Sequence, residues 1–156
     1  MEKLELKDLS PYLPYGLKII DGWGDEKTLD YSYLHNVHCK PILRPISDLT
    51  EEIEHNGEKF IPILRLYNVS EENEKDYSFE YEFIESWGSG KILRVLHDKD
   101  IYTDFIYSDF CFYSSLTIGG EQSHLQLKNQ YFLYTMLFEW HFDVFNLIKN
   151  KLGTSK

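Results

Sequence analysis

Basic residues are scarce in this sequence. Its 156 residues include 16 Lys and Arg against 26 Asp and Glu, which gives a formal net charge of -10. A protein that binds nucleic acid neutralises phosphates with Lys and Arg, so it needs the opposite sign. The composition therefore argues against direct nucleic-acid binding. It favours either a solvated acidic surface or a surface that docks onto a basic protein partner.

Cysteine and long apolar runs are also rare. The two cysteines, Cys39 and Cys111, lie far apart in the chain. Such a pair does not make a disulfide framework, which favours reduced thiols in a cytoplasmic protein. No apolar run approaches the roughly 20 residues of a membrane span, and the first residues alternate charges without an apolar signal segment. We therefore expect neither a membrane span nor a signal peptide.

Apolar and aromatic residues are plentiful enough for a folded core. Hydrophobic residues make up 42% of the chain and aromatic residues 16%. A chain of this length buries roughly 70% of the surface that it exposes when unfolded. We therefore expect a single globular domain over residues 1–156.

Alternation of apolar and polar residues predicts several strands. It is clearest in residues 77–96, where four aromatic residues alternate with polar ones before the turn "GSG" and a returning apolar run. This segment predicts a β-hairpin. The other segments that we expect to be extended are 17–23, 28–37, 40–46, 59–69 and 109–118.

Three segments carry helix signals. Ser10 and Pro11 begin a short helical turn that Pro14 and Gly16 end. Ser47 caps a short acidic helix that stops at residues 56–57. Apolar residues at intervals of three and four predict one long helix from 123 to 152. The predicted fold is α+β: a mostly antiparallel sheet with a short acidic helix and a long C-terminal helix packed on one face.

The negative charge is concentrated in one part of the sequence. Residues 48–85 hold twelve acidic residues and three basic ones, an excess of nine negative charges. We call this segment the acidic band and predict that it binds a basic partner, unless it serves only to keep the surface solvated. The residues that we expect to contact the partner are Glu71, Glu72, Glu74, Asp76, Glu80, Glu82 and Glu85.

The stretch "LHNVHCK" (34–40) raises the question of a metal site, because it holds His35, His38 and Cys39. Zinc needs three or four ligands in tetrahedral geometry. On a continuing strand His35 and His38 would point to opposite faces. Residues that folding could add are Cys111, His97 and His124. Because the local ligand set is incomplete, we expect the end of a strand, with no metal and no other cofactor.

The stretch "EWHFDVF" (139–145) resembles an acid–base set. On a helix, Glu139 and Asp143 would share a face, whereas His141 would lie about 200° away. We therefore expect a wet stripe of carboxylates and a hydrogen-bonded, half-buried histidine. The stretch "WGSGK" (87–91) lacks the glycine spacing of a phosphate-binding loop, and no nucleophile elbow is present. These patterns predict no catalytic residues and a protein that is not an enzyme.

Three segments resemble a group of small uncharacterised proteins from prophages and phages of Bacteroidetes bacteria. They are "LSPYLPYGLK" (9–18), "ILRPISDLTEEIEHNGEKFIPI" (42–63) and "LFEWHFDVFNLIKNKL" (137–152), about a third of the chain. The resemblance implies a phage context and the cytoplasm of a bacterial host. It supplies no catalytic residues.

In that context the leading hypothesis is a stoichiometric inhibitor of a host defence nuclease, similar to an anti-CRISPR protein, with a type VI, RNA-targeting effector as the candidate target. RNA-guided nucleases hold nucleic acid in a positively charged channel, which an acidic, aromatic-rich surface could occupy. Two other hypotheses stay open. One is a small metal-dependent or cysteine-dependent hydrolase with a dispersed site, and the other is an accessory protein of phage replication or assembly.

Overall fold

The computed structural model describes residues 4–34, 38–71, 79–86 and 90–156. The fold is α+β with mostly antiparallel sheets, as the sequence predicts. The chain divides into two compact units. We call Met1–Ile46 with Tyr134–Lys156 the terminal unit, and Ser47–Leu133 the central unit. The expectation of a single domain stays a prediction.

The terminal unit is built on a four-stranded sheet. Its helical turn follows the sequence signals, since Pro11 lies near the start and Gly16 ends it in the left-handed region at φ 65°. The strand order is β11-β3-β1-β2; β11 runs parallel to β3 and the other pairs are antiparallel. The elements are α1 (Leu6–Leu9), η1 (Ser10–Tyr15), β1 (Lys18–Ile20), β2 (Glu26–Thr28), β3 (Lys40–Leu43) and β11 (Thr154–Ser155).

Tyr12 joins the two ends of the chain in the core of the terminal unit. Its side chain is fully buried, and its hydroxyl donates a hydrogen bond to the Phe142 carbonyl at 2.6 Å. Its ring meets those of Phe138 and Phe145 edge-on, with centroids 5.1 and 6.3 Å away. A buried hydroxyl needs such a partner, because an unpaired polar group in the core is costly.

The predicted C-terminal helix is much shorter than expected. Helix α3 (Gln130–Glu139) has 10 residues, and among the described residues no helix is long and apolar enough to cross a membrane. His141 leaves the helix in the left-handed region at φ 63°. The Arg44 N–H then donates to the His141 carbonyl, and the Asp143 N–H to the Arg44 carbonyl, both at 2.8 Å. These long-range hydrogen bonds stop the helix that the apolar spacing alone favours.

The start of that predicted helix is also wrong. Residues 123–125 belong to strand β10 (Glu121–Leu125), which pairs antiparallel with β9 (Cys111–Ile118). Gly119 and Gly120 connect the two strands with φ angles of 56° and 88°. Two residues with positive φ are what a tight hairpin turn requires, so the double glycine is a hairpin signal rather than a helix boundary.

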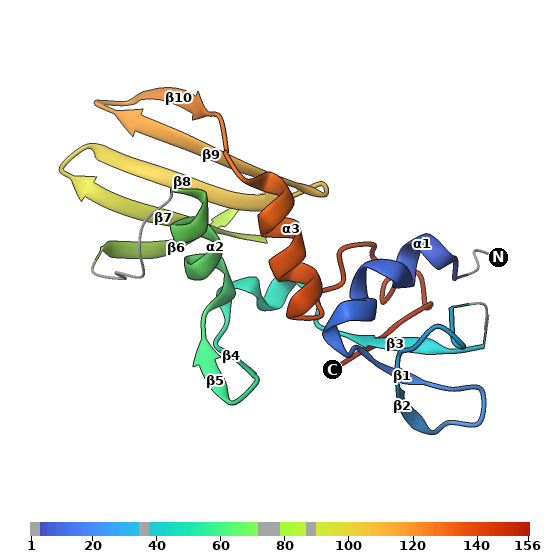
Figure 1. Ribbon diagram of the computed structural model, residues 1–156. Coiled ribbons are helices and arrows are strands. Elements are labelled where there is room, and N and C mark those ends of the chain that lie inside the picture. The colour runs from blue at the N-terminus through green and yellow to red at the C-terminus, as the bar shows by residue number, and fades with distance from the viewer. Residues whose placement is uncertain (1–3, 35–37, 72–78, 87–89) are drawn as a thin grey trace. The chain divides into compact units, whose positions relative to one another are not determined.

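The central unit contains a five-stranded antiparallel sheet in the order β10-β9-β8-β7-β6 (Figure 1). The predicted hairpin over residues 77–96 is confirmed by the pairing of β6 with β7 from Glu80↔Leu96 to Ser86↔Gly90. The remaining elements of the unit are η2 (Ile46–Thr50), β4 (Ile53–His55), β5 (Glu58–Phe60), α2 (Pro62–Ser70), β6 (Glu80–Ser86), β7 (Gly90–Asp98) and β8 (Ile101–Ser108).

One face of this sheet, the inner face, packs against α2. Tyr67 of α2 contacts the rings of Phe105 on β8 and Phe79, with centroids 5.8 and 5.5 Å away. Because side chains alternate across a strand, every second residue of each strand joins this face. Its buried members are Leu93, Val95, Thr103, Phe105, Tyr107, Phe112 and Ser114.

Two strand predictions are wrong, and the acidic helix is shorter than predicted. In the expected strand 28–37, Asp30 accepts hydrogen bonds from the backbone and side chain of Ser32, which makes a turn; residues 35–37 lie outside the described part. The expected strand 59–69 is mostly α2, with Pro62 at its first position, which suits proline. The expected acidic helix is the short η2, and Asn56 turns a small hairpin between β4 and β5.

Candidate functional site

The structure divides the acidic band into separate places. Glu72, Glu74 and Asp76 lie outside the described residues. Glu71 is exposed and follows the last turn of α2. Glu80, Glu82 and Glu85 belong to β6, the outermost strand of the five-stranded sheet.

The three glutamates of β6 do not share one face. Glu80 pairs with Leu96 and Glu82 with Arg94, on the face of the sheet opposite α2. We call this the outer face. Glu85 has the other parity and lies opposite Lys91. The hydrogen bond with Glu51 is the main cause that raises the pKa of Lys91, and the charge of Glu85 adds a smaller effect. Only Glu80 and Glu82 of these three can therefore act on one partner surface together with the outer face.

An ion pair with an aromatic ring lies beside Glu82 on the outer face. Arg94 donates from Nε and Nη2 to the two carboxylate oxygens of Asp104, at 2.7 and 2.9 Å. Its guanidinium also lies 3.8 Å from the centre of the Tyr102 ring. The hydrogen bond with Asp104 is the main cause that raises the pKa of Arg94. Two-point pairing fixes both side chains, so this part of the face is already ordered before any partner binds.

Apolar and aromatic side chains also reach solvent on this face. Leu96 is 37% exposed and Tyr113 is 48% exposed. Cys111 precedes Tyr113 by two residues, and a hydrogen bond with that thiol raises the pKa of the Tyr113 phenol. Large rings beside charged groups are typical of protein interfaces, where they supply contact area at low entropic cost.

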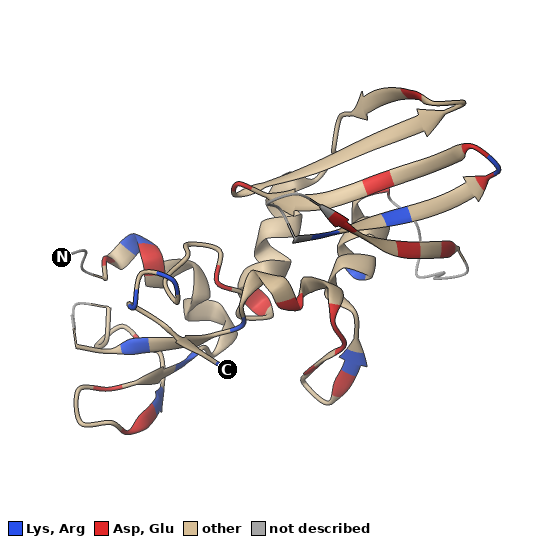
Figure 2. Cartoon of the chain, turned by 180° about the vertical axis from the view of Figure 1, so that it is seen from behind, with Lys and Arg blue, Asp and Glu red and all other residues tan. Residues whose placement is uncertain are grey.

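Strand β6 is an edge strand, since no other described strand pairs with its free side. An edge presents unpaired backbone N–H and C=O groups, and charged side chains there discourage pairing with other sheets. Glu80 and Glu82 therefore have a second candidate role, which is to prevent the β6 edge from pairing with the strands of other molecules. Figure 2 shows acidic positions along β6.

Part of the band's charge is already neutralised within the central unit. Glu51 pairs with Lys91 at 2.8 Å, and Glu58 pairs with Arg65. Glu80 and Glu82 are both exposed, and Arg94 of the outer face is engaged by Asp104. The outer face thus keeps two exposed carboxylates, Glu80 and Glu82, of which Glu82 also interacts with the charge of Arg94.

The stretch "LHNVHCK" forms no metal centre in the described part of the chain. His35 is outside that part, His38 is exposed, and Cys39 is buried with its Sγ 3.8 Å from the Tyr33 carbonyl. Burial raises the pKa of the Cys39 thiol. His97 instead contacts the Thr103 hydroxyl at 2.7 Å. The described residues include no group of three His, Cys, Asp or Glu that could hold a metal ion.

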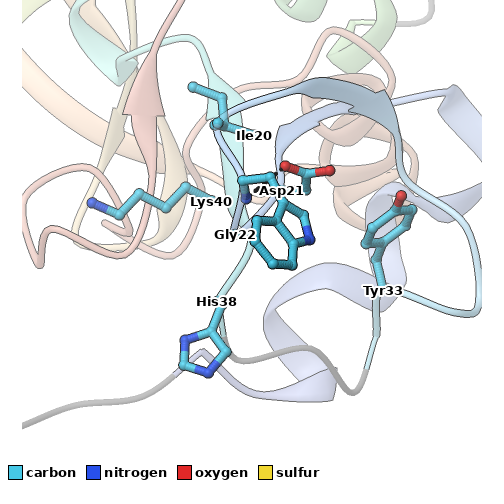
Figure 3. A pocket seen from close by; sticks show the side chains of 8 residues that line it. Ile20, Asp21, Gly22, Tyr33, His38 and Lys40 are labelled. Atoms are coloured by element: carbon cyan, nitrogen blue, oxygen red, sulfur yellow. Dashed lines mark hydrogen bonds between the residues drawn. The ribbon is translucent and has the colours of Figure 1, made fainter.

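The same stretch lines a pocket that the sequence did not predict. Pairing of β1 with β3 places Lys40 opposite Ile20, so His38 and Lys40 lie beside the turn that follows β1. The pocket has a volume of about 680 Å³, within the range of small-ligand sites. Its lining residues are Ile20, Asp21, Gly22, Trp23, Gly24, Tyr33, His38 and Lys40 (Figure 3).

The acid–base set suspected in "EWHFDVF" is a structural element. His141 is half-buried and donates from Nε2 to the Tyr15 carbonyl at 2.8 Å, as expected for a satisfied histidine. Asp143 is buried rather than on a wet stripe, and it accepts the N–H groups of Leu147 and Ile148 at 2.7 and 2.9 Å. Burial raises the pKa of Asp143. The carboxylate caps the turn that replaces the predicted helix.

Comparison with protein-family models, with curated proteins and with solved structures gives no match. The resemblance to phage proteins therefore stays a prediction.

Proposed function

We propose that this chain is a non-enzymatic interaction protein that binds a basic protein surface through the outer face of its five-stranded sheet. The single observation that supports this most is the composition of that face. It combines exposed Glu80 and Glu82 with the exposed side chains of Leu96 and Tyr113 on one rigid sheet.

Each component of the face has a physical role in such a complex. Exposed carboxylates attract a positively charged surface from a distance and raise the association rate, an effect that salt screens. Charge alone gives little affinity, so aromatic and aliphatic side chains must supply the buried contact. The fixed pair of Arg94 and Asp104 adds order at little further entropic cost.

The partner that we propose is a host defence protein with a basic groove that holds nucleic acid, an RNA-guided nuclease being the leading candidate. This identity follows from the sequence resemblance and from charge complementarity. An acidic surface that occupies such a groove would compete with nucleic acid. The chain would then act in stoichiometric amounts and would need neither a cofactor nor a metal.

A capture experiment tests the proposal. The tagged chain is incubated with nuclease-treated bacterial lysate, because nucleic acid would otherwise fill the groove. The test variant is Glu80→Gln with Glu82→Gln, and the control is Glu85→Gln, which removes a charge from the same strand on the opposite face. We expect a basic nucleic-acid enzyme to be captured by the parent and the control, to be lost with the double variant, and to be displaced by added RNA.

The result against the proposal is equally specific. If the double variant captures the same proteins as the parent, the outer face is not the binding surface. If it instead forms soluble oligomers or aggregates while the parent stays monomeric, the two glutamates serve to guard the β6 edge. Size-exclusion chromatography of both variants separates these outcomes.

A further inference from the structure

The pocket of the terminal unit contains a hydrogen-bonded turn that presents an exposed indole. Asp21 Oδ1 accepts the backbone N–H groups of Trp23 and Asp25 at 2.9 and 3.0 Å. Two backbone hydrogen bonds close the turn. The Asp21 N–H donates to the Asp25 carbonyl, and the Gly24 N–H donates to the Asp21 carbonyl. Trp23 is nevertheless 93% exposed. The backbone is ordered while the largest side chain of the turn faces solvent, which suits a preorganised binding site.

Elsewhere the chain twice builds the same group of three side chains. Arg65 pairs with Glu58 while its guanidinium lies 3.6 Å from the centre of the Phe60 ring. In both groups the carboxylate and the ring are two residues apart on one strand, Glu58 with Phe60 and Tyr102 with Asp104. Residues two apart share a face of a strand, so an arginine can pair with the carboxylate and stack on the ring at once.

In the pocket, Asp21 and Trp23 are also two residues apart, but they lie in the turn after β1 rather than on a strand, and the hydrogen bond from the Trp23 N–H to Asp21 Oδ1 connects them. Both line the pocket, together with the ring of Tyr33. Desolvation opposes ionisation of Asp21, but the N–H groups of Asp25, Trp23 and Gly24 and the charge of Lys27 together lower the pKa of the carboxyl. Among the described residues no cation lies over the Trp23 indole. In Figure 3 the side chain of Lys40 extends away from Asp21 and Tyr33.

We infer that this pocket binds the guanidinium group of an arginine on a protein partner, with Trp23 as the stacking surface and Asp21 as the paired carboxylate. The inference goes beyond the proposed function, because the pocket belongs to the terminal unit and its test needs no contribution from the outer face.

The chemistry of the pocket favours arginine over other ligands. Indole is the best aromatic surface for a cation, and a guanidinium is flat and weakly hydrated, so it stacks more readily than an ammonium. An anion would meet the Asp21 carboxylate, and a neutral ring would gain nothing from its charge. The positive charge of Lys40 repels any cation in the pocket and so lowers its affinity. Removing that charge should therefore strengthen arginine binding, whereas removing the charge of Asp21 should weaken it.

A titration of the full-length chain with N-acetyl-arginine amide tests the inference, with N-acetyl-citrulline amide as the neutral analogue of the same shape. The readout is the indole N–H resonance of Trp23 in a two-dimensional NMR spectrum, identified by its loss in Trp23→Phe. We expect a saturable shift with a dissociation constant on the order of 1–10 mM, as suits a single side chain. The citrulline analogue, inorganic phosphate and glucose should shift it at least about fivefold less at equal concentration.

Two variants complete the design. Asp21→Asn keeps an oxygen that can accept the Trp23 and Asp25 N–H groups but removes the charge, so arginine binding should weaken about fivefold or more. Lys40→Gln should strengthen it about twofold at low salt, and this gain should vanish at high salt. Tighter binding of phosphate or glucose than of the arginine probe would overturn the inference, as would weaker arginine binding by Lys40→Gln. Neither result bears on the outer face, because Glu80 and Glu82 are unchanged.

Discussion

The two units of the molecule are closed in different ways. In the central unit, strands β6 to β10 are neighbours in sequence as well as in the sheet. In the terminal unit, the hydrogen bond between Tyr12 and Phe142 joins residues 130 positions apart, and β11 pairs with β3. The comparison shows that turns between neighbouring strands build the sheet of the central unit, whereas the terminal unit depends on contacts between the two ends of the chain.

The same difference separates the two candidate surfaces. The outer face follows from strand alternation, so its residues are set by sequence parity alone. The pocket arises because β1 and β3 pair and bring residues 38–40 beside residues 20–24. A surface made by local rules can be anticipated from a sequence, and a concave site made by long-range pairing cannot.

The largest effect should come from removing one core ring in each unit. Phe105→Ala in the central unit and Phe142→Ala in the terminal unit each delete a ring with 0% exposure. Each should lower the free energy of unfolding by about 3–5 kcal/mol, measured by urea denaturation. Tyr131→Ala, at an 83% exposed position, should change it by less than about 0.5 kcal/mol. A loss below about 1 kcal/mol at either core ring would contradict the assigned packing.

A smaller effect tests the long-range closure of the terminal unit. Tyr12→Phe removes the hydroxyl that donates to the Phe142 carbonyl and accepts the Val144 N–H at 3.4 Å. Buried groups that lose their partner should cost about 1–3 kcal/mol. Tyr31→Phe, where the ring is 79% exposed, is the matched control. Equal unfolding curves for the two variants would show that this hydrogen bond does not hold the ends together.

The central unit should tolerate one substitution that increases stability. Asn68 of α2 is buried, and neither atom of its carboxamide has a hydrogen-bond partner in the structure, within the residues described. Asn68→Leu has nearly the same shape and removes the desolvated polar group, so it should raise the free energy of unfolding by about 1 kcal/mol. The exposed Asn150→Leu serves as control. A clear loss of stability in Asn68→Leu would reveal a polar partner for the carboxamide.

The smallest expected effect concerns pH and Asp143. Burial raises the pKa of this carboxyl above its ordinary value of 3.8, so the native state holds its proton to higher pH than the unfolded state. The stability that Asp143 contributes is therefore fully present below 3.8 and declines as pH rises through the native pKa. The stability difference between the parent and Asp143→Asn should shrink from pH 4 to pH 7. A difference that grows over this range would contradict the raised pKa.

Much of the fold could be predicted because its signals are local. Gly16 ends the first helical turn, and alternation over residues 77–96 makes the β6–β7 hairpin. The missed elements had signals that competed with a stronger pattern. Pro62 is a good first residue of a helix, but the apolar run around it favoured a strand. Gly119 with Gly120 is a hairpin turn, but the apolar spacing that follows favoured a helix.

The candidate sites divide in the same way. The outward direction of Glu80 and Glu82 follows from the alternation that predicted the hairpin. The buried position of Asp143 could not be predicted, because it depends on hydrogen bonds between Arg44 and the residues after α3. Trp23 is an aromatic residue in a glycine-containing turn, which is a local signal, but Tyr33, His38 and Lys40 reach the pocket from a later part of the chain.

The central claim is that the outer face binds a basic surface, and the association rate tests it most directly. Stopped-flow or surface-based kinetics with the captured partner would compare the parent, the Glu80→Gln and Glu82→Gln double variant, and Glu85→Gln over a range of salt concentrations. We predict that the double variant associates several-fold more slowly at low salt, that Glu85→Gln stays close to the parent, and that high salt removes the difference. Equal association rates for all three proteins, without salt dependence, would contradict the account.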